Sequence, residues 1–361
     1  MENRKSIVVL FGGISSEHEV SCLSAASILE HINREKYDIS TIGITKDGEW
    51  FLTEASPADI ADGSWKNAQG NRKAFVAPDR AAGGVVVLNA DGTAEIIKAD
   101  AVFPVLHGKN GEDGTMQGLL QLAGIPFVGS DTAASSASMD KAITKAMVEH
   151  RGVVDQAKCF VVHQNAYDRD RDAQLEAVNS FFADTYPLFV KPANAGSSVG
   201  ISKVKRAEDL AKALDIAFAE DSKVLVEETI TGREIEVAVL GNDNPQASCI
   251  GEIFAANEFY DYNAKYENDK SHTGIVRDLT PEKEQEIRDK AVSVYETMGC
   301  SGMSRVDFFL EEGGRVVFNE INTLPGFTSI SMYPKLWEES GIPNEELIDR
   351  LIKLALEKYD K

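Results

Sequence analysis

The order of hydrophobic and polar positions at the start of the chain predicts alternating strands and helices. Ser6–Phe11 is a short run rich in Val and Ile that ends at Gly12-Gly13, which is typical of a buried strand. Val20–Ile32 has apolar residues at helical spacing, and Tyr37–Ile44 reads as a second strand. A strand, a helix and a strand joined by short connections form a βαβ unit, so we expect a parallel α/β layer.

The rest of the chain continues this alternation. Residues from about Thr53 to Ala94 are looser and predict peripheral hairpins or loops, whereas Asp131–His150 predicts one helix that begins a second block. Pro281–Met298 predicts a helix with Pro at its start and Gly just past its end. We expect further strands at Ala101–Leu106, Pro126–Val128, within Phe182–Lys191, and at Val224–Glu227, Glu234–Leu240, Phe308–Leu310 and Arg315–Ile321. We expect further helices at Gly114–Ala123, Ala207–Ala219 and Asn344–Lys358.

Length, charge and cysteine content narrow the class of protein. The 361 residues suit two or three domains, and a net charge of −21 without any run of Lys and Arg disfavours a nucleic-acid or membrane-surface role. No stretch approaches the roughly 20 apolar residues of a membrane span, and the first apolar run is too short for a signal peptide. The four cysteines form no CxxC pair and no zinc spacing, so we expect reduced thiols in a cytosolic protein.

The segment Lys191–Gly200 (KPANAGSSVG) is the first candidate for chemistry. A predicted strand delivers a Lys to a loop of small residues that includes Gly196, Ser197 and Ser198. Small residues let backbone N–H groups approach phosphate oxygens, and the hydroxyls and the ammonium add donors. The loop lacks the GK[ST] of a Walker A motif and is not GxGxxG. A flexible surface turn is the alternative interpretation.

Two short polar segments predict a metal site. Arg305-Val306-Asp307 and Glu320-Ile321-Asn322 each place polar residues at i and i+2, which puts them on one face of a strand. A turn at Gly313-Gly314 brings Asp307 near Glu320 and Asn322. Three oxygen donors suit Mg²⁺, which leaves coordination sites for phosphates, and Arg305 could hold an oxyanion. An exposed strand face with ordinary ion pairs is the alternative.

Three further segments follow predicted strands and carry weaker signals. Gly12–Ser21 is a glycine turn that opens a helix, where Glu19 could bind an ammonium or simply stabilise the first helical turn. The loop 107–114 (HGKNGEDG) follows a strand, and in open parallel sheets ligands bind beyond the carboxyl ends of strands. In 325–332 (PGFTSISM) the backbone N–H groups could receive an anion, or the segment could be a plain turn and helix cap.

Taken in order, seven motifs resemble the D-alanine–D-alanine ligases of the ATP-grasp superfamily. They are GGISSEHEVS, HGKNGEDG, MDK, VKPANAGSSVG, EFYDYNAKY, RVDFF and NEINTLPGFTSIS, and they cover nearly the whole chain. The resemblance implies a three-domain α/β fold with boundaries at 1–128, 129–227 and 228–361, and ATP between the last two domains. It also implies Mg²⁺ dependence, peptidoglycan-precursor synthesis in the cytoplasm and a homodimer.

The resemblance implies a role for each residue that matches a family motif. The phosphates of ATP would be contacted by Lys141, Lys191, Gly196, Ser197 and Ser198. The rest of the nucleotide would be bound by Glu227, Glu228, Ile230, Glu234, Phe259, Lys265 and Phe309. Two Mg²⁺ ions, with Mn²⁺ as a possible substitute, would be held by Asp307, Glu320 and Asn322. The amino acids and the reaction centre would be served by Glu19, His107, Tyr266, Arg305, Gly326, Ser331 and Met332.

Within that set, Glu19 would bind the ammonium of the first D-alanine, and Tyr266 would form a hydrogen-bonded latch with Ser197 and Glu19. Arg305 and the N–H of Gly326 would stabilise the oxyanion.

The resemblance also bears on the identity of the acceptor, which is the second substrate of the ligase reaction. Tyr266 stands where ligases that make D-alanyl-D-lactate usually have His, and Met332 is the large apolar residue typical of D-alanine acceptors. Ile275–Arg277 and Ile330 depart from the family pattern. A D-alanine–D-serine ligase and a catalytically silent ATP-grasp nucleotide-binding protein remain the alternatives, and another ATP-grasp enzyme such as a carboxylase is disfavoured.

Overall fold

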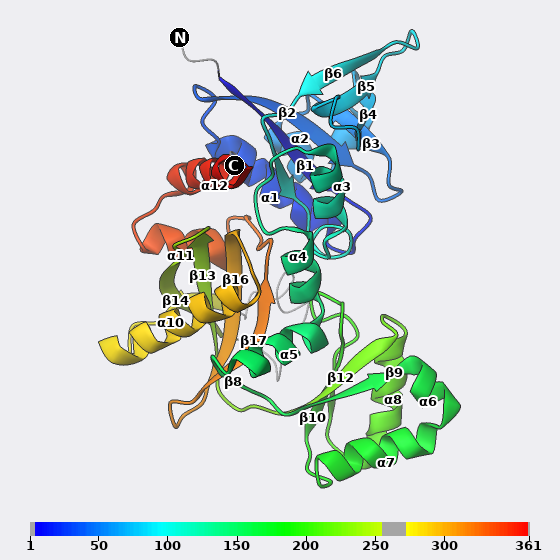
Figure 1. The fold of residues 1–361 in the computed structure, drawn as a ribbon, viewed down its shortest axis with the longest axis vertical. Helices are drawn as coiled ribbons and strands as arrows, with labels where there is room; N and C mark the ends of the chain where they lie inside the picture. The colour runs from blue at the N-terminus through cyan, green and yellow to red at the C-terminus, as the bar shows by residue number, and fades with distance from the viewer. Residues whose placement is uncertain (1–3, 255–271, 360–361) are drawn as a thin grey trace.

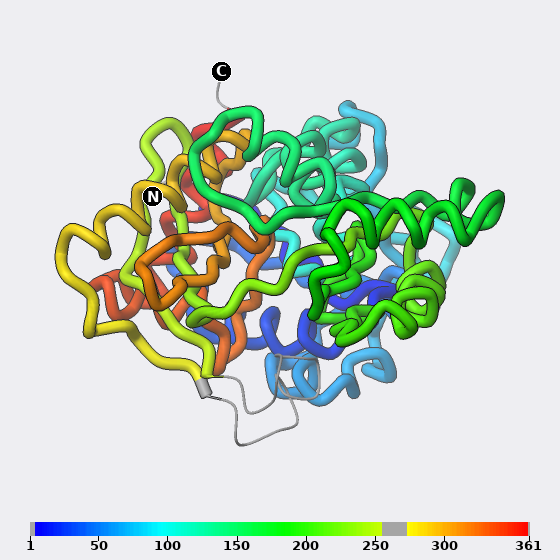
Figure 2. Tube along the Cα trace, turned by 90° about the horizontal axis from the view of Figure 1, so that it is seen from below, coloured from blue at the N-terminus to red at the C-terminus, as the bar shows by residue number. Residues whose placement is uncertain are grey.

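The computed structural model describes residues 4–254 and 272–359, and it places their strands in three sheets. Figure 1 shows the N-terminal sheet at the top, the central sheet at the lower right and the C-terminal sheet between these levels. Seen from below in Figure 2, the green central segment extends to the right and the orange and yellow C-terminal segment to the left. Each sheet packs against helices, which confirms the α/β fold class predicted from the sequence.

The N-terminal sheet has the strand order β6-β5-β4-β3-β2-β1-β7. Its strands are β1 (Lys5–Gly12), β2 (Tyr37–Ile44), β3 (Trp50–Thr53), β4 (Arg72–Val76), β5 (Gly84–Leu88), β6 (Ala94–Lys98) and β7 (Ala101–Val105). Its helical segments are α1 (His18–His31), α2 (Pro57–Ala61), the 3₁₀ helix η1 (Ser64–Asn67) and α3 (Thr115–Ala123). β1 pairs in parallel with β2 and β7, as the βαβ pattern predicts. Its side chains alternate between two buried faces, one packed against α1 and the other against α3.

The central sheet is antiparallel, with the order β11-β10-β12-β9. Its strands are β9 (Cys159–His163), β10 (Leu188–Pro192), β11 (Ser202–Val204) and β12 (Lys223–Glu228). Its helices are α6 (Gln164–Arg169), α7 (Arg171–Phe181) and α8 (Ala207–Phe218). Val190 and Val226 belong to the apolar core under the helices, so the alternate residues Lys191 and Glu227 point to the opposite face.

The C-terminal sheet has the order β15-β14-β13-β16-β17-β8 and is antiparallel except between β17 and β8. Its strands are β8 (Asp155–Gln156), β13 (Arg233–Gly241), β14 (Gln246–Phe254), β15 (His272–Ile275), β16 (Gly302–Leu310) and β17 (Val316–Asn322). The helices of this part are α4 (Thr132–Met139), α5 (Lys141–Arg151), α10 (Pro281–Thr297), α11 (Met332–Glu339) and α12 (Asn344–Tyr359). The register pairs Asp307 directly with Glu320, as the predicted glycine turn requires.

The single helix predicted over 131–150 is wrong, because Asp140 divides it into α4 and α5. Asp140 has extended backbone (φ −83°, ψ 100°), and its side chain accepts hydrogen bonds from the N–H groups of Ala142 and Ile143. It is therefore the N-cap of α5, a role that short polar acceptors favour. The break starts a new helix at Lys141, so it fixes the face that this helix presents to the neighbouring sheets.

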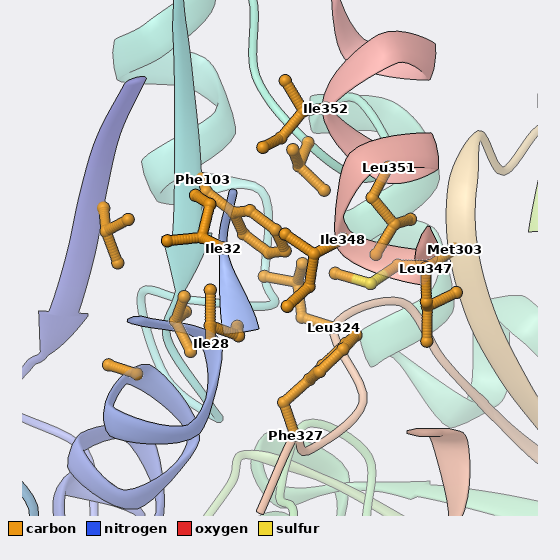
Figure 3. Packing of buried hydrophobic residues seen from close by; sticks show 14 of the residues in the cluster. Ile28, Ile32, Phe103, Met303, Leu324, Phe327, Leu347, Ile348, Leu351 and Ile352 are labelled. Carbon is orange, nitrogen blue, oxygen red and sulfur yellow. The ribbon is translucent and has the colours of Figure 1, made fainter. Parts of the chain in front are cut away.

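The N-terminal and C-terminal parts of the chain share one hydrophobic core, which we call the shared core (Figure 3). Ile28 and Phe103 of the N-terminal part pack in the same cluster as Leu324, Ile348 and Leu351. The domain boundaries expected at 128/129 and 227/228 remain predictions, and the sheets do not follow one of them, since β8 joins the C-terminal sheet. In the described part of the chain, no helix combines the length and the apolar character needed to cross a membrane.

Candidate active site

A cavity of about 360 Å³ lies between the central and C-terminal sheets. Strands β10 and β12 line one side, β13, β16 and β17 line the other, and α5 and the loop Ala193–Gly200 complete it. Volumes of this order are typical of small-molecule sites. The residues predicted to bind nucleotide that line it are Lys141, Lys191, Gly196, Ser197, Ser198, Glu227, Glu228, Ile230, Glu234 and Phe309. The predicted residues Phe259, Lys265 and Tyr266 lie outside the described residues.

Two lysines flank one carboxylate at one end of the cavity, in what we call the lysine–glutamate cluster (Lys145, Lys191 and Glu227). Each ammonium lies 2.8 Å from an oxygen of Glu227. Burial by itself would raise the pKa of Glu227, but the two ammonium groups lower it to about 2. Burial opposes the charge of Lys191 as well, and Glu227 still raises the pKa of this lysine. Glu227 and Lys191 therefore stabilise each other's charged forms.

Lys145 was not among the residues predicted from the sequence. It lies one helical turn after Lys141 on α5, and residues at i and i+4 share a helix face. That spacing was visible in the sequence as a signal. Lys141 points toward the loop, where its ammonium donates to the carbonyl of Ala195 at 2.8 Å and lies 3.6 Å from Glu320.

At the other end of the cavity one buried guanidinium lies among acidic side chains, in what we call the carboxylate cluster (Glu236, Asp307 and Glu320 around Arg305). Arg305 donates to both oxygens of Asp307, at 2.8 and 2.7 Å, and lies 3.2 Å from Glu236. Burial would lower the pKa of Arg305, yet these carboxylates raise it well above its usual range. Glu236 was missed from the sequence, although it continues the alternation of β13 two residues after Glu234.

The predicted metal ligands fit a hard divalent cation by their donor set. Asp307 and Glu320 are directly paired across β16 and β17, and Asn322 pairs with Arg305 two residues along. Carboxylate and amide oxygens are the donors that Mg²⁺ prefers. Arg305 engages one side of Asp307, and a carboxylate offers further lone pairs. In the described ranges no three His, Cys, Asp or Glu side chains converge as a ready metal site, so the amide and ligand oxygens would complete it.

Glu234, the residue predicted to face the ribose, lies next to this cluster. Burial and then the charge of Asp307 raise its pKa. Its neighbour across the sheet is Phe309, another residue of the predicted nucleotide site.

The loop Ala193–Gly200 closes one wall of the cavity and contacts the N-terminal part of the chain. Ser197 donates its hydroxyl hydrogen to a carboxylate oxygen of Glu17 at 2.5 Å. Ser197 and Ser198 both have left-handed backbone, with φ of 49° and 59°. A Cβ at Gly196 would lie 3.0 Å from the carboxylate of Glu17, so a larger residue there would crowd this contact. The loop predicted from small residues is thus held against α1.

Of the two glutamates in this motif, Glu17 contacts Ser197. The latch expected among Tyr266, Ser197 and Glu19 stays a prediction, since Tyr266 lies outside the described residues. Glu19 is exposed on the other side of α1, where it pairs with Lys46. Side chains two positions apart on a helix point about 200° away from each other, so Glu17 and Glu19 cannot both face the cavity. Glu17 lies at the N-cap position of α1, and this placement was not deducible from the motif alone.

His107 is buried near Glu17, in the loop after β7 where the sequence placed it. Its ring nitrogens lie 3.1 Å from the hydroxyl of Ser24 and 3.1 Å from the carbonyl of Leu324. Glu112, which sequence reasoning missed, lies 3.8 Å from the ring. Burial raises the pKa of Glu112 and outweighs the effect of His107. The segment HGKNGEDG therefore supplies two titratable groups to this region.

The segment 325–332 forms a compact turn before α11. The hydroxyl oxygen of Ser331 accepts a hydrogen bond from the N–H of Thr328 at 3.0 Å, and a Cβ at Gly326 would lie 2.8 Å from that oxygen. Gly326 and Ser331 thus lie together in this turn, and their roles toward the oxyanion and the second amino acid stay predictions. Met332 is 5% exposed and belongs to the shared core, where it packs against Gly251. Its predicted role as an acceptor marker stays a prediction.

Comparisons with known proteins agree along the whole chain. A family model described as "D-ala D-ala ligase N-terminus" matches residues 6–130, and one described as "D-ala D-ala ligase C-terminus" matches residues 147–353. A D-alanine–D-alanine ligase of Caldicellulosiruptor bescii is 50% identical over 353 residues, which cover 98% of this chain and 95% of that protein. One of Ruminiclostridium cellulolyticum is 47% identical over 372 residues, covering 99% and 97%.

Solved structures give the same family. The VanG D-Ala:D-Ser ligase of Enterococcus faecalis has a TM-score of 0.87 and 40% identity, covering 98% of this chain and 100% of that one. The D-alanine–D-alanine ligase of Coxiella burnetii has a TM-score of 0.86 and 37% identity, covering 99% and 95%. Together with the cavity, these matches establish that the chain belongs to the D-alanine–D-alanine ligase family of the ATP-grasp fold.

Proposed function

We propose that the protein joins two D-alanine molecules at the expense of ATP, giving D-alanyl-D-alanine for peptidoglycan precursors. The observation that carries the proposal is the cavity between two sheets, with lysines at one end and an arginine among carboxylates at the other. Family membership supports the same activity. A carboxylate is a poor electrophile, so one D-alanine carboxylate would first be converted to D-alanyl phosphate, which the amine of the second D-alanine attacks.

Residues in different parts of the cavity would bind different parts of ATP. Lys141 and Lys191 would bind the phosphates, and Glu227 and Glu234 would face the base and the ribose. Gly196 and Ser198 lie in the same wall of the cavity and would close over the phosphates.

The metal sites belong to the carboxylate cluster and its neighbour Asn322. Asp307, Glu320 and Asn322 would hold two Mg²⁺ ions, for which Mn²⁺ could substitute. Such ions supply charge neutralisation to a transferring phosphoryl group. Arg305 and the N–H of Gly326 would stabilise the oxyanion of the tetrahedral intermediate, since preorganised donors act best where charge develops.

The amino-acid sites would lie where the N-terminal part meets the loop. Glu17, in place of Glu19, would face the ammonium of the first D-alanine, with His107 beside it. Ser331 would bind the carboxylate of the second D-alanine, and Tyr266 would act in a lid that excludes water from the acyl phosphate. The contact of Glu17 with Ser197 supports this arrangement.

D-serine is a second candidate acceptor, because the E. faecalis structure described as a D-Ala:D-Ser ligase resembles this chain over its whole length. Tyr266 and Met332 favour D-alanine.

We also propose that the protein acts in the cytoplasm and forms a homodimer. Light scattering of the purified protein during size-exclusion chromatography would test the oligomeric state. A silent nucleotide-binding protein is disfavoured, because the lysines, Arg305 and the predicted metal ligands are all present.

The deciding experiment measures phosphate release by the purified protein with ATP and Mg²⁺. D-alanine is supplied alone and then together with D-serine or D-lactate, and the products are identified by mass. We expect rapid release with D-alanine alone and a D-alanyl-D-alanine product. Preferential formation of the mixed dipeptide would assign D-serine as the acceptor. Absence of release with every combination, while ATP still binds, would overturn the ligase proposal.

A further inference from the structure

Lys145 is a buried lysine whose position is fixed by two elements. It is 8% exposed, and its carbonyl accepts a hydrogen bond from the side chain of Gln156 on β8 at 3.0 Å. Its ammonium lies 2.8 Å from Glu227. A buried ammonium is costly unless a carboxylate compensates it, so the pairing of Lys145 with Glu227 is the interaction that makes this site tenable.

Helix α5 carries its two lysines to different ends of the cavity. Four residues along a helix correspond to a rise of about 6 Å. Lys141 reaches the carbonyl of Ala195 in the loop and approaches Glu320, whereas Lys145 reaches Glu227 on β12. The helix therefore places one ammonium at the phosphate end and one at the base end.

Lys191 also lowers the pKa of Glu227, but it has a second partner in the cavity. Its ammonium is shared, at 2.8 Å from Glu227 and 3.2 Å from the side-chain oxygen of Asn319. In the proposed function it is also the ammonium that turns toward the phosphates. Lys145 would then be the cation that stays with Glu227 when nucleotide is bound.

We propose that Lys145 is a positioning residue that keeps Glu227 ionised and oriented as a hydrogen-bond acceptor, so that the cavity selects a 6-amino purine over a 6-oxo purine. The inference rests on the proposed function, in which Glu227 faces the base. An ionised carboxylate only accepts hydrogen bonds, a 6-amino group donates, and a 6-oxo group accepts. A site that offers a hydrogen-bond acceptor disfavours a base that also presents an acceptor there, because a buried polar group is then left unpaired.

Removal of Lys145 should therefore change selectivity more than turnover. Without its ammonium, and with Lys191 at the phosphates, the buried Glu227 becomes protonated and can donate to a 6-oxo group. The preference for ATP over inosine triphosphate should fall about tenfold or more in Lys145→Met, because a hydrogen bond to a charged group is lost. The loss should appear in KM, with kcat at saturating ATP retained within about threefold. Lys145→Arg should restore most of the preference.

The experiment measures kcat and KM for ATP and for inosine triphosphate in D-alanine-dependent phosphate release. The variants are Lys145→Met, Lys145→Arg, Glu227→Gln and the double variant, with Lys212→Met, an exposed lysine of α8, as the matched control. If Lys145 acts through Glu227, the double variant should be no less selective than Glu227→Gln. An unchanged ATP preference in Lys145→Met, or an equal rise of both KM values, would overturn the proposal.

Binding measurements separate this proposal from the proposed function. ADP and inosine diphosphate titrated into each variant report base selectivity without any turnover. If the wild-type protein shows no ligase activity but binds ADP more tightly than inosine diphosphate, and Lys145→Met loses that preference, the ligase proposal fails and the role of Lys145 stands. If Lys145→Met does not fold, the ratio of the two dissociation constants in Lys145→Arg and Glu227→Gln still decides: the ratio must persist in the first and fall in the second.

Discussion

The two ends of the cavity carry opposite charge arrangements on similar frameworks. In the lysine–glutamate cluster two ammonium groups surround one carboxylate, whereas in the carboxylate cluster one guanidinium faces several carboxylates. Lys145 and Glu227 in the first cluster and Glu236, Arg305 and Asp307 in the second are buried, whereas the side chain of Glu320 is 40% exposed. The first cluster thus groups two cations around one carboxylate, while the second groups one cation with three carboxylates, of which Asp307 and Glu320 are predicted metal ligands.

The strongest test of this difference removes the charge of one carboxylate from the carboxylate cluster. Asp307→Asn should abolish D-alanine-dependent phosphate release, because a predicted metal ligand loses its charge. The measurement is turnover across a wide range of Mg²⁺ concentrations, with Asp243→Asn, an exposed residue between β13 and β14, as control. Turnover above about a tenth of wild type would contradict the assignment of Asp307 to the metal.

Removing the guanidinium of Arg305 tests the same cluster by deleting its cation instead of a carboxylate. Arg305→Ala should lower kcat by roughly 10²–10³-fold if Arg305 stabilises the oxyanion. It should also lower the free energy of unfolding by about 3–5 kcal/mol, since buried carboxylates lose their partner. Urea unfolding in EDTA isolates the stability effect. If added Mg²⁺ does not restore any of the lost stability, the interpretation that this cluster binds a divalent cation is wrong.

The pH dependence of stability should distinguish the lysine–glutamate cluster. The pKa of Glu227 is lowered to about 2 from 4.5, so its ionised form stabilises the folded state above pH 4.5 and this contribution disappears as the pH falls toward 2. At pH 7 Glu227→Gln should therefore be less stable than wild type by up to about 3 kcal/mol. Denaturation at several pH values should show the gap closing in acid. A gap that is constant with pH would argue against the ion pairs.

The smallest expected effect concerns the loop Ala193–Gly200, which lines one wall of the cavity. Glu17→Gln should lower kcat about tenfold, because the hydroxyl of Ser197 loses a charged acceptor. Glu19→Gln, which changes the exposed partner of Lys46, should leave kcat within about twofold of wild type. The paired comparison uses the same substitution on the same helix. The reverse order of effects would restore the role that the sequence suggested for Glu19.

The sequence predicted those elements whose signals are local. The strand at Tyr37–Ile44 has the predicted bounds, and α10 begins at the predicted Pro281 because proline suits the first helical turn. The strand expected at Pro126–Val128 forms only an isolated parallel bridge, in which Phe127 pairs with Val102 of β7. The break at Asp140 was missed because the residues on both sides of it favour helix equally well.

The candidate site was predictable where it depends on strand alternation and less so elsewhere. Asp307 and Glu320 face each other because the period of two and the glycine turn determine their register. Lys145 and Glu236 could be recognised as site residues only from the three-dimensional arrangement, because the approach of α5 and β13 to the cavity gives them their partners. The choice between Glu17 and Glu19 depended on where the helix begins, and sequence patterns locate helix ends poorly.

The shared core has a consequence for how the chain is made. Apolar residues of β1, β7 and α12 belong to one cluster, and α12 follows the other described helices in the chain. Until α12 has been made, the face of the N-terminal sheet that packs against α1 lacks the C-terminal residues of its apolar cluster. The central sheet, with its own cluster under α7 and α8, has all of its strands and helices once Glu228 has emerged. The nascent chain should thus fold its central sheet before it completes the shared core, and it should depend on protection from aggregation until α12 emerges.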